Sequence, residues 1–207
     1  MTALGVVDYG VGNMQSVANA LNRVEVQWDF VSRPEEVCSF GRLLLPGVGA
    51  FGPAMKRLDS SGLKHEVTSA VAGGTQLLGI CLGMQLLALD SEEDPGVEGL
   101  GFLDAHTRRL EGSAVGTHTG FARIAVGAAN GADRALQPSR DFYFNHSYHL
   151  VPSAESDAVG WMDWSGSTVV AAVVRDNVAG VQFHPEKSQG QGLSVLYNFA
   201  TTGALVL

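Results

Sequence analysis

One cysteine stands in a sequence setting that is typical of an activated nucleophile. Residues 79–83, Gly-Ile-Cys-Leu-Gly, follow a strand-like stretch and open a helix-like stretch with Leu82, Leu86 and Leu89 on one face. This Gly-x-nucleophile-x-Gly pattern forms a tight strand-to-helix turn that needs small residues on both sides of the nucleophile. The helix start offers partial positive charge and free N–H groups, which favour a thiolate and can bind an oxyanion. We therefore interpret Cys81 as a nucleophile. Cys38 has no such setting and is interpreted as a buried structural cysteine.

A base for this cysteine is expected at His184. The histidine ends a strand-like stretch and precedes Pro185, which favours extended geometry at the preceding residue. In an extended segment residues i and i+2 point the same way, so Glu186 can lie beside the His184 ring. A carboxylate there fixes the tautomer and stabilises the imidazolium. Taken alone, the pair is more typical of a surface histidine near a solvated glutamate. Together with the cysteine turn it predicts a Cys-His-Glu triad.

The order of strand-like and helix-like stretches predicts the secondary structure that positions these residues. The first half alternates strand-like and helix-like stretches, which indicates βαβ units and a mainly parallel sheet. The second half is richer in strands separated by Gly, Asn, Asp and Ser. We predict one three-layer α/β domain over residues 1–207, with an open, mixed, largely parallel sheet, helices on both faces and an antiparallel second half. The predicted strands are 4–7, 24–31, 43–45, 77–80, 142–148, 158–161, 169–174 and 178–183. The predicted helices are one that begins after an Asn13 cap, 54–63, 65–72 and 193–200, and an exposed loop is predicted at 127–140.

Composition limits the classes of function. The 207 residues are 45% hydrophobic and 16% charged, with a net charge of −8, which argues against a general nucleic-acid or membrane surface. The longest run of β-branched residues and alanine, residues 169–174, is far shorter than the roughly 18 residues of a membrane-spanning helix. No cationic leader opens the chain, and two cysteines do not form a disulfide framework. A cytoplasmic protein is expected. The low charge is explained equally well by a surface patch that a partner covers and by a large internal core.

The motifs resemble a known family. Residues 79–85 (Gly-Ile-Cys-Leu-Gly-Met-Gln) together with 183–186 (Phe-His-Pro-Glu) are similar to class I, triad-type glutamine amidotransferases. Within that family, four further blocks resemble the glutaminase subunits of imidazole glycerol phosphate synthases, which supply ammonia in histidine biosynthesis. These blocks are 8–13, 45–51, 142–148 and 184–189. The resemblance runs from about Leu4 to Phe199. It implies a flavodoxin-like fold, hydrolysis of L-glutamine without metal or cofactor, and a heterodimer with a (β/α)₈ barrel cyclase or synthase subunit.

The resemblance also implies roles for individual residues. Cys81 attacks the carboxamide to form a glutamyl thioester, His184 acts as base and then acid, and Glu186 orients it. The oxyanion is expected at backbone N–H groups of the 46–49 segment, which can be turned away until the partner is loaded, and of the residue after the nucleophile: Val48, Gly49 and Leu82. The amino-acid portion of glutamine is expected at Gly49, Gln85, Glu93, Ser147 and Tyr148, with Glu92 leaving the register at Glu93 open. The positions that face the barrel are Val11, Asn13, Phe121 and Lys187.

One segment departs from the pattern. The family commonly has Pro-His-Met-Gly-Trp-Asn where residues 117–122 read Thr-His-Thr-Gly-Phe-Ala. Because the family segment packs at the barrel interface, the departure is expected to affect the partner. A paralogous group that feeds ammonia to amidino-sugar synthesis in surface-polysaccharide pathways shares the Gly-Phe pair and an Asp-Phe-Tyr-Phe block like residues 141–144. Amidino-sugar synthesis is therefore the alternative to the histidine pathway. Two further hypotheses are a non-catalytic assembly subunit and an unrelated cysteine hydrolase with a larger substrate.

Overall fold

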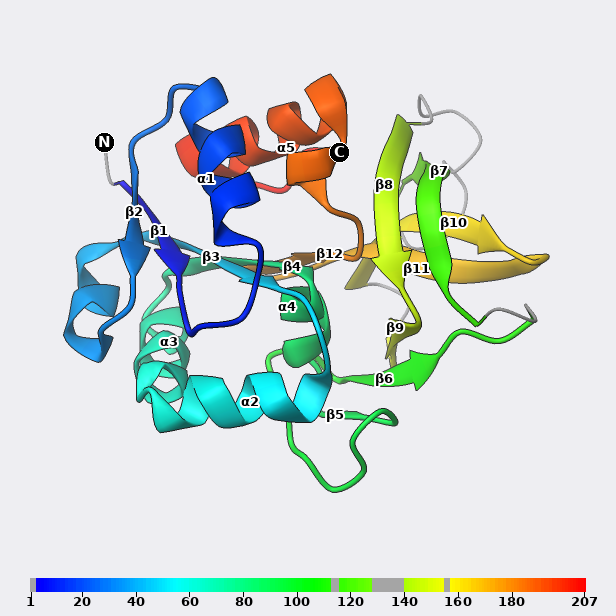
Figure 1. Ribbon diagram of the computed structural model, residues 1–207, viewed down its shortest axis with the longest axis horizontal. Helices are drawn as coiled ribbons and strands as arrows, with labels where there is room; N and C mark the ends of the chain where they lie inside the picture. The colour runs from blue at the N-terminus through cyan, green and yellow to red at the C-terminus, as the bar shows by residue number, and fades with distance from the viewer. Residues whose placement is uncertain (1–2, 113–115, 128–139, 155–156) are drawn as a thin grey trace.

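A nine-stranded sheet forms the centre of the described residues. The computed structural model describes residues 3–112, 116–127, 140–154 and 157–207. The sheet order is β2-β1-β3-β4-β12-β11-β10-β7-β8 (Figure 1). Its strands are β1 (Leu4–Val7), β2 (Trp28–Val31), β3 (Arg42–Gly47), β4 (Gln76–Cys81), β7 (His118–Val126), β8 (Arg140–His146), β10 (Ala158–Trp164), β11 (Ser167–Arg175) and β12 (Val178–Val181). The strands from β2 to β12 in this order are parallel, and the sheet continues in antiparallel pairings to β8.

Helices cover both faces of the parallel part of the sheet. One face carries α1 (Met14–Arg23) and α5 (Gln189–Thr202), and the other carries α2 (Phe51–Ser60), α3 (Leu63–Ala72) and α4 (Leu82–Leu86) (Figure 1). The strand β3 shows why two cores form. Successive side chains of a strand point to opposite faces, so Leu44 joins the core under α1 and α5, whereas Leu43 and Leu45 join the core under the other helices. The predicted mixed α/β fold with helices on both faces is confirmed.

A second, three-stranded sheet crosses the end of the first. It pairs β5 (Asp90–Ser91), β6 (Ala105–Arg109) and β9 (Tyr148–Pro152). The prediction of a single strand over 142–148 is therefore wrong. The chain leaves the large sheet after His146 and enters the small one at Tyr148, and the Ser147 carbonyl between them accepts a hydrogen bond from the Leu110 N–H at 2.8 Å. Local sequence does not reveal the change, because both halves of the segment have strand character.

Other element boundaries also differ from prediction. Val24 is the C-cap of α1, so β2 begins only at Trp28 rather than at residue 24. The helix after Cys81 ends at Leu86, and Leu89 is 40% exposed and pairs through its N–H with the Ala105 carbonyl of the second sheet. The Asn13 cap is confirmed, since its side chain accepts from the Ser16 N–H at 3.2 Å. Most of the predicted loop at 127–140, residues 128–139, lies outside the described residues.

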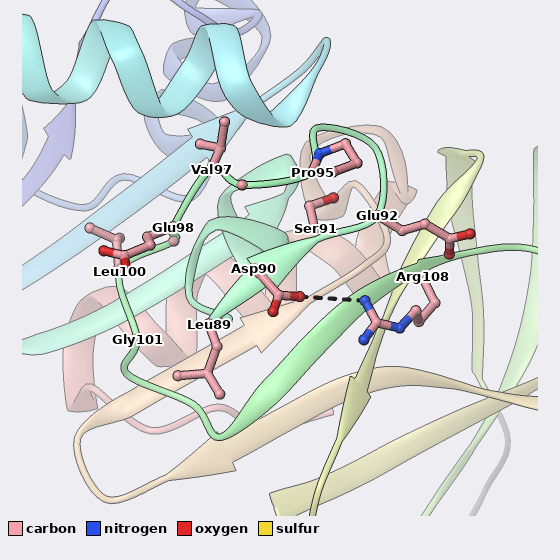
Figure 2. Close-up of a pocket in the computed structure, with 12 residues that line it drawn as sticks. Leu89, Asp90, Ser91, Glu92, Pro95, Val97, Glu98, Leu100, Gly101 and Arg108 are labelled. Atoms are coloured by element: carbon pink, nitrogen blue, oxygen red, sulfur yellow. Dashed lines mark hydrogen bonds and ion pairs between the residues drawn. The ribbon is translucent and has the colours of Figure 1, made fainter.

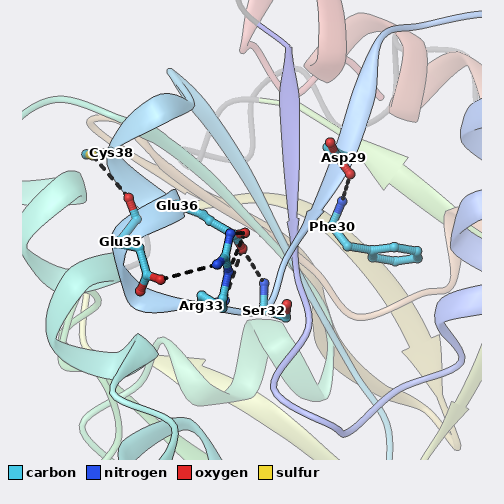
Figure 3. A network of polar contacts seen from close by, with 7 residues as sticks. All are labelled: Asp29, Phe30, Ser32, Arg33, Glu35, Glu36 and Cys38. Atoms are coloured by element: carbon cyan, nitrogen blue, oxygen red, sulfur yellow. Dashed lines mark hydrogen bonds and ion pairs between the residues drawn. The ribbon is translucent and has the colours of Figure 1, made fainter.

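The connection between β2 and β3 forms a short 3₁₀ helix, η1 (Pro34–Ser39), on the exposed edge of the sheet. Its entry is held by Arg33 and Glu36: the guanidinium contacts Glu36 Oε1 at 2.6 and 2.8 Å, and Glu36 Oε2 accepts from the Arg33 N–H (Figure 3). Cys38 lies on this helix. It is exposed and free, so its interpretation as a buried cysteine is wrong.

Three adjacent parallel strands end at the same edge. In the register of the sheet, Gly47 of β3 is opposite Cys81 of β4, and Ile80 is opposite Val181 of β12. In open α/β sheets, ligands bind outside the carboxyl ends of such strands. This edge therefore brings together the segments that carry the predicted oxyanion groups, nucleophile and base. Among the described residues, no helix has the length and apolar character needed to cross a membrane.

Candidate active site

The backbone at Cys81 has the conformation of a nucleophile elbow. Its φ of +54° and ψ of −110° place a non-glycine residue in a region that L-residues rarely adopt. The flanking glycines allow the turn to close. A Cβ on Gly79 would lie 2.6 Å from the Gly83 carbonyl oxygen, and one on Gly83 would collide with the Leu45 carbonyl oxygen of β3. The requirement for small neighbours thus follows from backbone-to-backbone contacts between β3, β4 and α4.

His184 and Glu186, the predicted base and orienter, lie side by side as their spacing predicts. His184 has extended backbone angles, and its Nδ1 lies 2.8 Å from Glu186 Oε1. Both side chains are only 3% exposed. The His184 side chain also hydrogen-bonds with Cys81. Burial lowers the pKa of His184, but the hydrogen bonds and charges of Cys81 and Glu186 outweigh it and raise the pKa to about 9. The imidazolium form is therefore favoured beside the sulfur.

A second histidine in the same pocket has the opposite electrostatics. His146 is 6% exposed, and its Nδ1 donates to the Tyr148 carbonyl at 2.8 Å. Burial, helped by the charges of the nearby histidines and opposed by that hydrogen bond, lowers the pKa of His146 to about 3. No carboxylate faces it among the described contacts. Of the two, only His184 therefore combines an orienting carboxylate with contact to Cys81.

A pocket of about 210 Å³ surrounds these groups. This volume is below the roughly 300–1,000 Å³ of pockets for drug-sized ligands and suits a single small molecule. The side chains of Cys81 and His184 are joined there by every residue predicted for the oxyanion hole and for glutamine binding. These are Val48, Gly49, Leu82, Gln85, Glu93, Ser147 and Tyr148. Glu186 lies behind His184 and does not line the pocket.

The side chains of Glu93 and Glu92 face different pockets. Glu93 lines the catalytic pocket, and its Oε2 accepts from the Phe51 N–H at 2.9 Å, at the start of α2. Glu92 turns to a different groove of about 760 Å³ beside residues 89–101, where Arg108 contacts Asp90 at 3.4 Å (Figure 2). Glu92 Oε2 accepts from the Arg109 N–H at 3.0 Å. The carboxylate available to a ligand beside Cys81 is therefore that of Glu93.

Sequence reasoning missed Gln182, which contacts Cys81 from behind the pocket, and the pocket residues Asn145 and His146. Gln182 is fully buried, donates to the sulfur of Cys81 at 3.7 Å and accepts from Gln85 Nε2 at 3.2 Å. Gln85 Nε2 also donates to the Tyr148 carbonyl at 2.9 Å, so these amides link the elbow helix to both sheets. The signal for Gln182 was its spacing, because residues 182 and 184 share a direction in extended chain. The pocket residues Asn145 and His146 carried no comparable signal.

Residues 117–122, whose sequence differs from the family pattern, reach the pocket as well as the outer surface. Thr117, in place of the family proline, lines the pocket and lies 2.6 Å from Ser147 through the two hydroxyl groups. His118 is buried and stacks on Phe144, with ring centroids 5.0 Å apart. Phe121 is 51% exposed. The departure therefore also reaches the pocket, because Thr117 contacts a predicted glutamine-binding side chain.

The predicted partner-facing residues lie in two groups. Phe121 packs edge-to-face on Tyr143 at 5.6 Å, and the Lys187 ammonium lies 5.7 Å from the centre of the same ring. Val11 and Asn13 lie in the turn between β1 and α1, where Val11 is partly buried and Asn13 is exposed. Among the described residues, no group of three or more histidine, cysteine or acidic side chains is arranged to hold a metal ion.

Comparisons with known proteins agree with this geometry. The family described as glutamine amidotransferase class-I matches residues 5–202. The fold is similar to a crystal structure titled glutamine amidotransferase, with a TM-score of 0.74 at 22% identity over 95% of this chain and 97% of that one. The chain belongs to the class I glutamine amidotransferase family.

Curated relatives show which members of this family the chain is similar to. The chain is 39% identical to imidazole glycerol phosphate synthase subunit HisH of Moorella thermoacetica, covering 96% of this chain and 94% of the relative. It is 40% identical to the HisH subunit of Wolinella succinogenes, over 97% of this chain and 100% of the relative. The predicted resemblance to these glutaminase subunits is confirmed.

Proposed function

We propose that this chain is the glutaminase subunit of an imidazole glycerol phosphate synthase, acting in the cytoplasm in histidine biosynthesis. The observation that carries the proposal is the buried line of Glu186, His184 and Cys81 at one wall of a small pocket. The full-length likeness to HisH subunits supports the pathway over the amidino-sugar alternative. The small pocket also argues against a cysteine hydrolase with a larger substrate.

The reaction uses the triad twice. The Cys81 thiolate attacks the carboxamide carbon of glutamine, and the developing oxyanion is held by the Leu82 N–H and an N–H of Val48 or Gly49. The His184 imidazolium donates its proton to the leaving nitrogen, so ammonia departs and a glutamyl thioester remains. His184 then takes a proton from water, which attacks the thioester and releases glutamate and the thiolate. Glu186 holds the imidazole in place through both steps.

The amino-acid end of glutamine is assigned to other residues that line the pocket. The Glu93 carboxylate is suited to the α-ammonium group, because an opposite charge recognises it directly. Ser147, Tyr148 and Gly49 surround the α-carboxylate end, and Gln85 holds Tyr148 in position through its carbonyl. The pocket thereby selects an amino acid whose side chain reaches Cys81.

The partner proposed for this subunit is a (β/α)₈ barrel synthase that receives the ammonia. Contact would run through Val11, Asn13, Phe121 and Lys187, of which Asn13 and Phe121 are exposed and the other two are partly buried. Free ammonia would be wasted, so the lone chain is expected to turn over glutamine slowly. The partner loaded with its own ligand is expected to raise turnover by about 10²-fold or more, a coupling of a few kcal/mol.

The test compares two nitrogen sources in the assembled complex. Cys81→Ala is expected to abolish synthesis from glutamine while leaving synthesis from added ammonium intact, because acceptor chemistry belongs to the partner. Cys38→Ala, on the exposed η1 helix, is the matched control and should behave as wild type. Retention of more than a few per cent of glutamine turnover by Cys81→Ala would refute the assignment.

The pathway is tested by complementation. A strain that lacks its histidine-pathway glutaminase should grow without histidine at low ammonium when this chain and its barrel partner are expressed. Failure to grow, with soluble protein present, would favour the amidino-sugar pathway instead.

A further inference from the structure

Tyr9 carries an unpaired hydroxyl group in the interior. The residue follows β1 and is 4% exposed, and its hydroxyl has no hydrogen-bond partner in the described structure. A buried hydroxyl without a partner costs free energy, so such groups are rare unless another conformation satisfies them. A phenylalanine would fill the same space without this cost. The Tyr9 hydroxyl is therefore expected to have a function that offsets this cost.

The position of this hydroxyl is informative. A Cβ added to Gly47 would lie 2.7 Å from the Tyr9 hydroxyl oxygen, 3.0 Å from Leu82 Cβ and 3.1 Å from the Gly83 nitrogen. The hydroxyl thus lies where the end of β3 meets the first turn of α4. These are the two segments that supply the proposed oxyanion N–H groups. Burial raises the pKa of Tyr9, and the charge of Cys81 raises it further, which places the phenol in the electrostatic field of the nucleophile.

The backbone beside Tyr9 contains two glycines. Val48 lies between Gly47 and Gly49, and Gly49 has a φ of +99° with no atom within 4 Å of the place where a Cβ would stand. Glycines tolerate both signs of φ, so the peptide groups on either side of Val48 can turn at small steric cost. Only the orientation that directs an N–H into the pocket stabilises an oxyanion.

We propose that Tyr9 is a positioning residue of the oxyanion hole, whose hydroxyl bonds to the backbone of residues 47–49 when that segment turns an N–H toward Cys81. The phenol donates to a carbonyl of the segment and so fixes the plane of its peptide. Tyr9 touches neither glutamine nor the reacting atoms. The inference rests on the proposed glutaminase function and adds to it a residue that holds the hole open.

The variant Tyr9→Phe separates this role from simple packing. It keeps the ring and removes only the hydroxyl. In the complex with the partner and its ligand, the kcat for glutamine should fall roughly three- to tenfold, as expected for one neutral hydrogen bond, with KM within about twofold of wild type. The Tm of the isolated chain should stay the same or rise, because an unpaired group is removed. Tyr197→Phe, at a residue 48% exposed, is the matched control and should change neither quantity.

A second measurement reports on the oxyanion hole itself. L-Glutamate γ-semialdehyde adds the Cys81 sulfur to its aldehyde carbon, forming a C–S bond and turning the carbonyl oxygen into the oxygen of a tetrahedral hemithioacetal. The thiol proton goes to that oxygen or stays on His184. Tyr9→Phe should weaken binding of this aldehyde by the same factor as kcat/KM and leave the affinity for glutamate unchanged, because only the tetrahedral adduct fills the hole.

Three results would overturn the proposal. One is wild-type kcat and wild-type aldehyde affinity in Tyr9→Phe. Another is an equal loss of affinity for aldehyde and glutamate, which indicates general damage to the pocket. The third is a lower Tm of the isolated chain, which shows that the hydroxyl is already paired at rest. A wild-type complex that does not hydrolyse glutamine would instead refute the proposed function, whatever Tyr9 does.

Discussion

Two histidine–carboxylate pairs in this protein have almost the same geometry and very different surroundings. His184 Nδ1 lies 2.8 Å from Glu186 Oε1, and His106 Nδ1 lies 2.9 Å from Asp90 Oδ1. The first pair is 3% exposed on both sides, whereas the second is 37% and 44% exposed. The first contacts Cys81, and the second shares its carboxylate with Arg108 beside the groove in Figure 2.

The difference shows that distance alone does not define a catalytic pair. Charges attract more strongly where water is excluded, and exposed ion pairs contribute little because solvent screens them. Burial lets Glu186 hold His184 in one orientation, while Asp90 is shared between His106 and Arg108 in solvent. The following predictions test this contrast, in order of decreasing effect.

Removing each histidine gives the largest contrast. His184→Ala should lower glutamine turnover in the complex on the order of 10²–10⁴-fold, because Cys81 loses its base. His106→Ala should leave turnover within about twofold, since an exposed pair away from the pocket has no part in the reaction. Steady-state kinetics on both variants measures the ratio, and a harmless His184→Ala would leave Cys81 without its proposed base.

Removing each carboxylate charge gives a smaller contrast. Glu186→Gln should lower turnover by at least about tenfold, yet less than His184→Ala, because an orienter contributes less than the base it orients. Asp90→Asn is the matched change in the exposed pair and should be nearly neutral. If both amide variants had the same activity, burial would not be the feature that distinguishes the two pairs.

The pH dependence of stability contrasts the two histidines of the pocket. The pKa of His184 in the fold, about 9, exceeds its ordinary value of 6.5, so the imidazolium stabilises the fold fully below about pH 6.5 and this contribution is lost as pH rises through 9. The free energy of unfolding of wild type relative to His184→Ala should therefore fall across this range.

His146 has a pKa of about 3 in the folded protein, so its effect on stability depends on pH in the opposite direction. The contribution of neutral His146 to the free energy of unfolding is fully present above about pH 6.5 and is lost as pH falls toward 3. The free energy of unfolding of wild type relative to His146→Gln should therefore fall as the pH is lowered through this range. Denaturant titrations at a series of pH values give both curves, and parallel curves for the two variants would contradict the opposite assignments.

The smallest effect is expected far from the pocket, at the Arg33–Glu36 pair of Figure 3. The Arg33 side chain is 68% exposed, so the short contacts of its guanidinium are screened by solvent. Arg33→Ala should leave both Tm and glutamine turnover at wild-type values within the precision of each measurement. A large drop in Tm would show that this exposed pair holds the edge of the sheet.

Residue spacing alone was enough to predict the chemistry that is local in the chain. The elbow at Cys81 depends on two flanking glycines, and the His184–Glu186 contact depends on an extended step of two residues. Both are short-range backbone geometry, which is why neither needed knowledge of the rest of the fold. The mixed α/β fold followed in the same way from alternating patterns, because apolar periodicity reports which faces are buried.

Contacts between distant segments settled the rest, and these exist only in the tertiary structure. They turned Glu93 rather than Glu92 into the pocket, broke a strand-like segment at Ser147 between two sheets, and placed Gln182 against the sulfur of Cys81. They also buried one histidine–carboxylate pair and left the other in solvent. None of these outcomes follows from local sequence, because the burial of a side chain is set by what packs over it, and those residues lie far away in the chain.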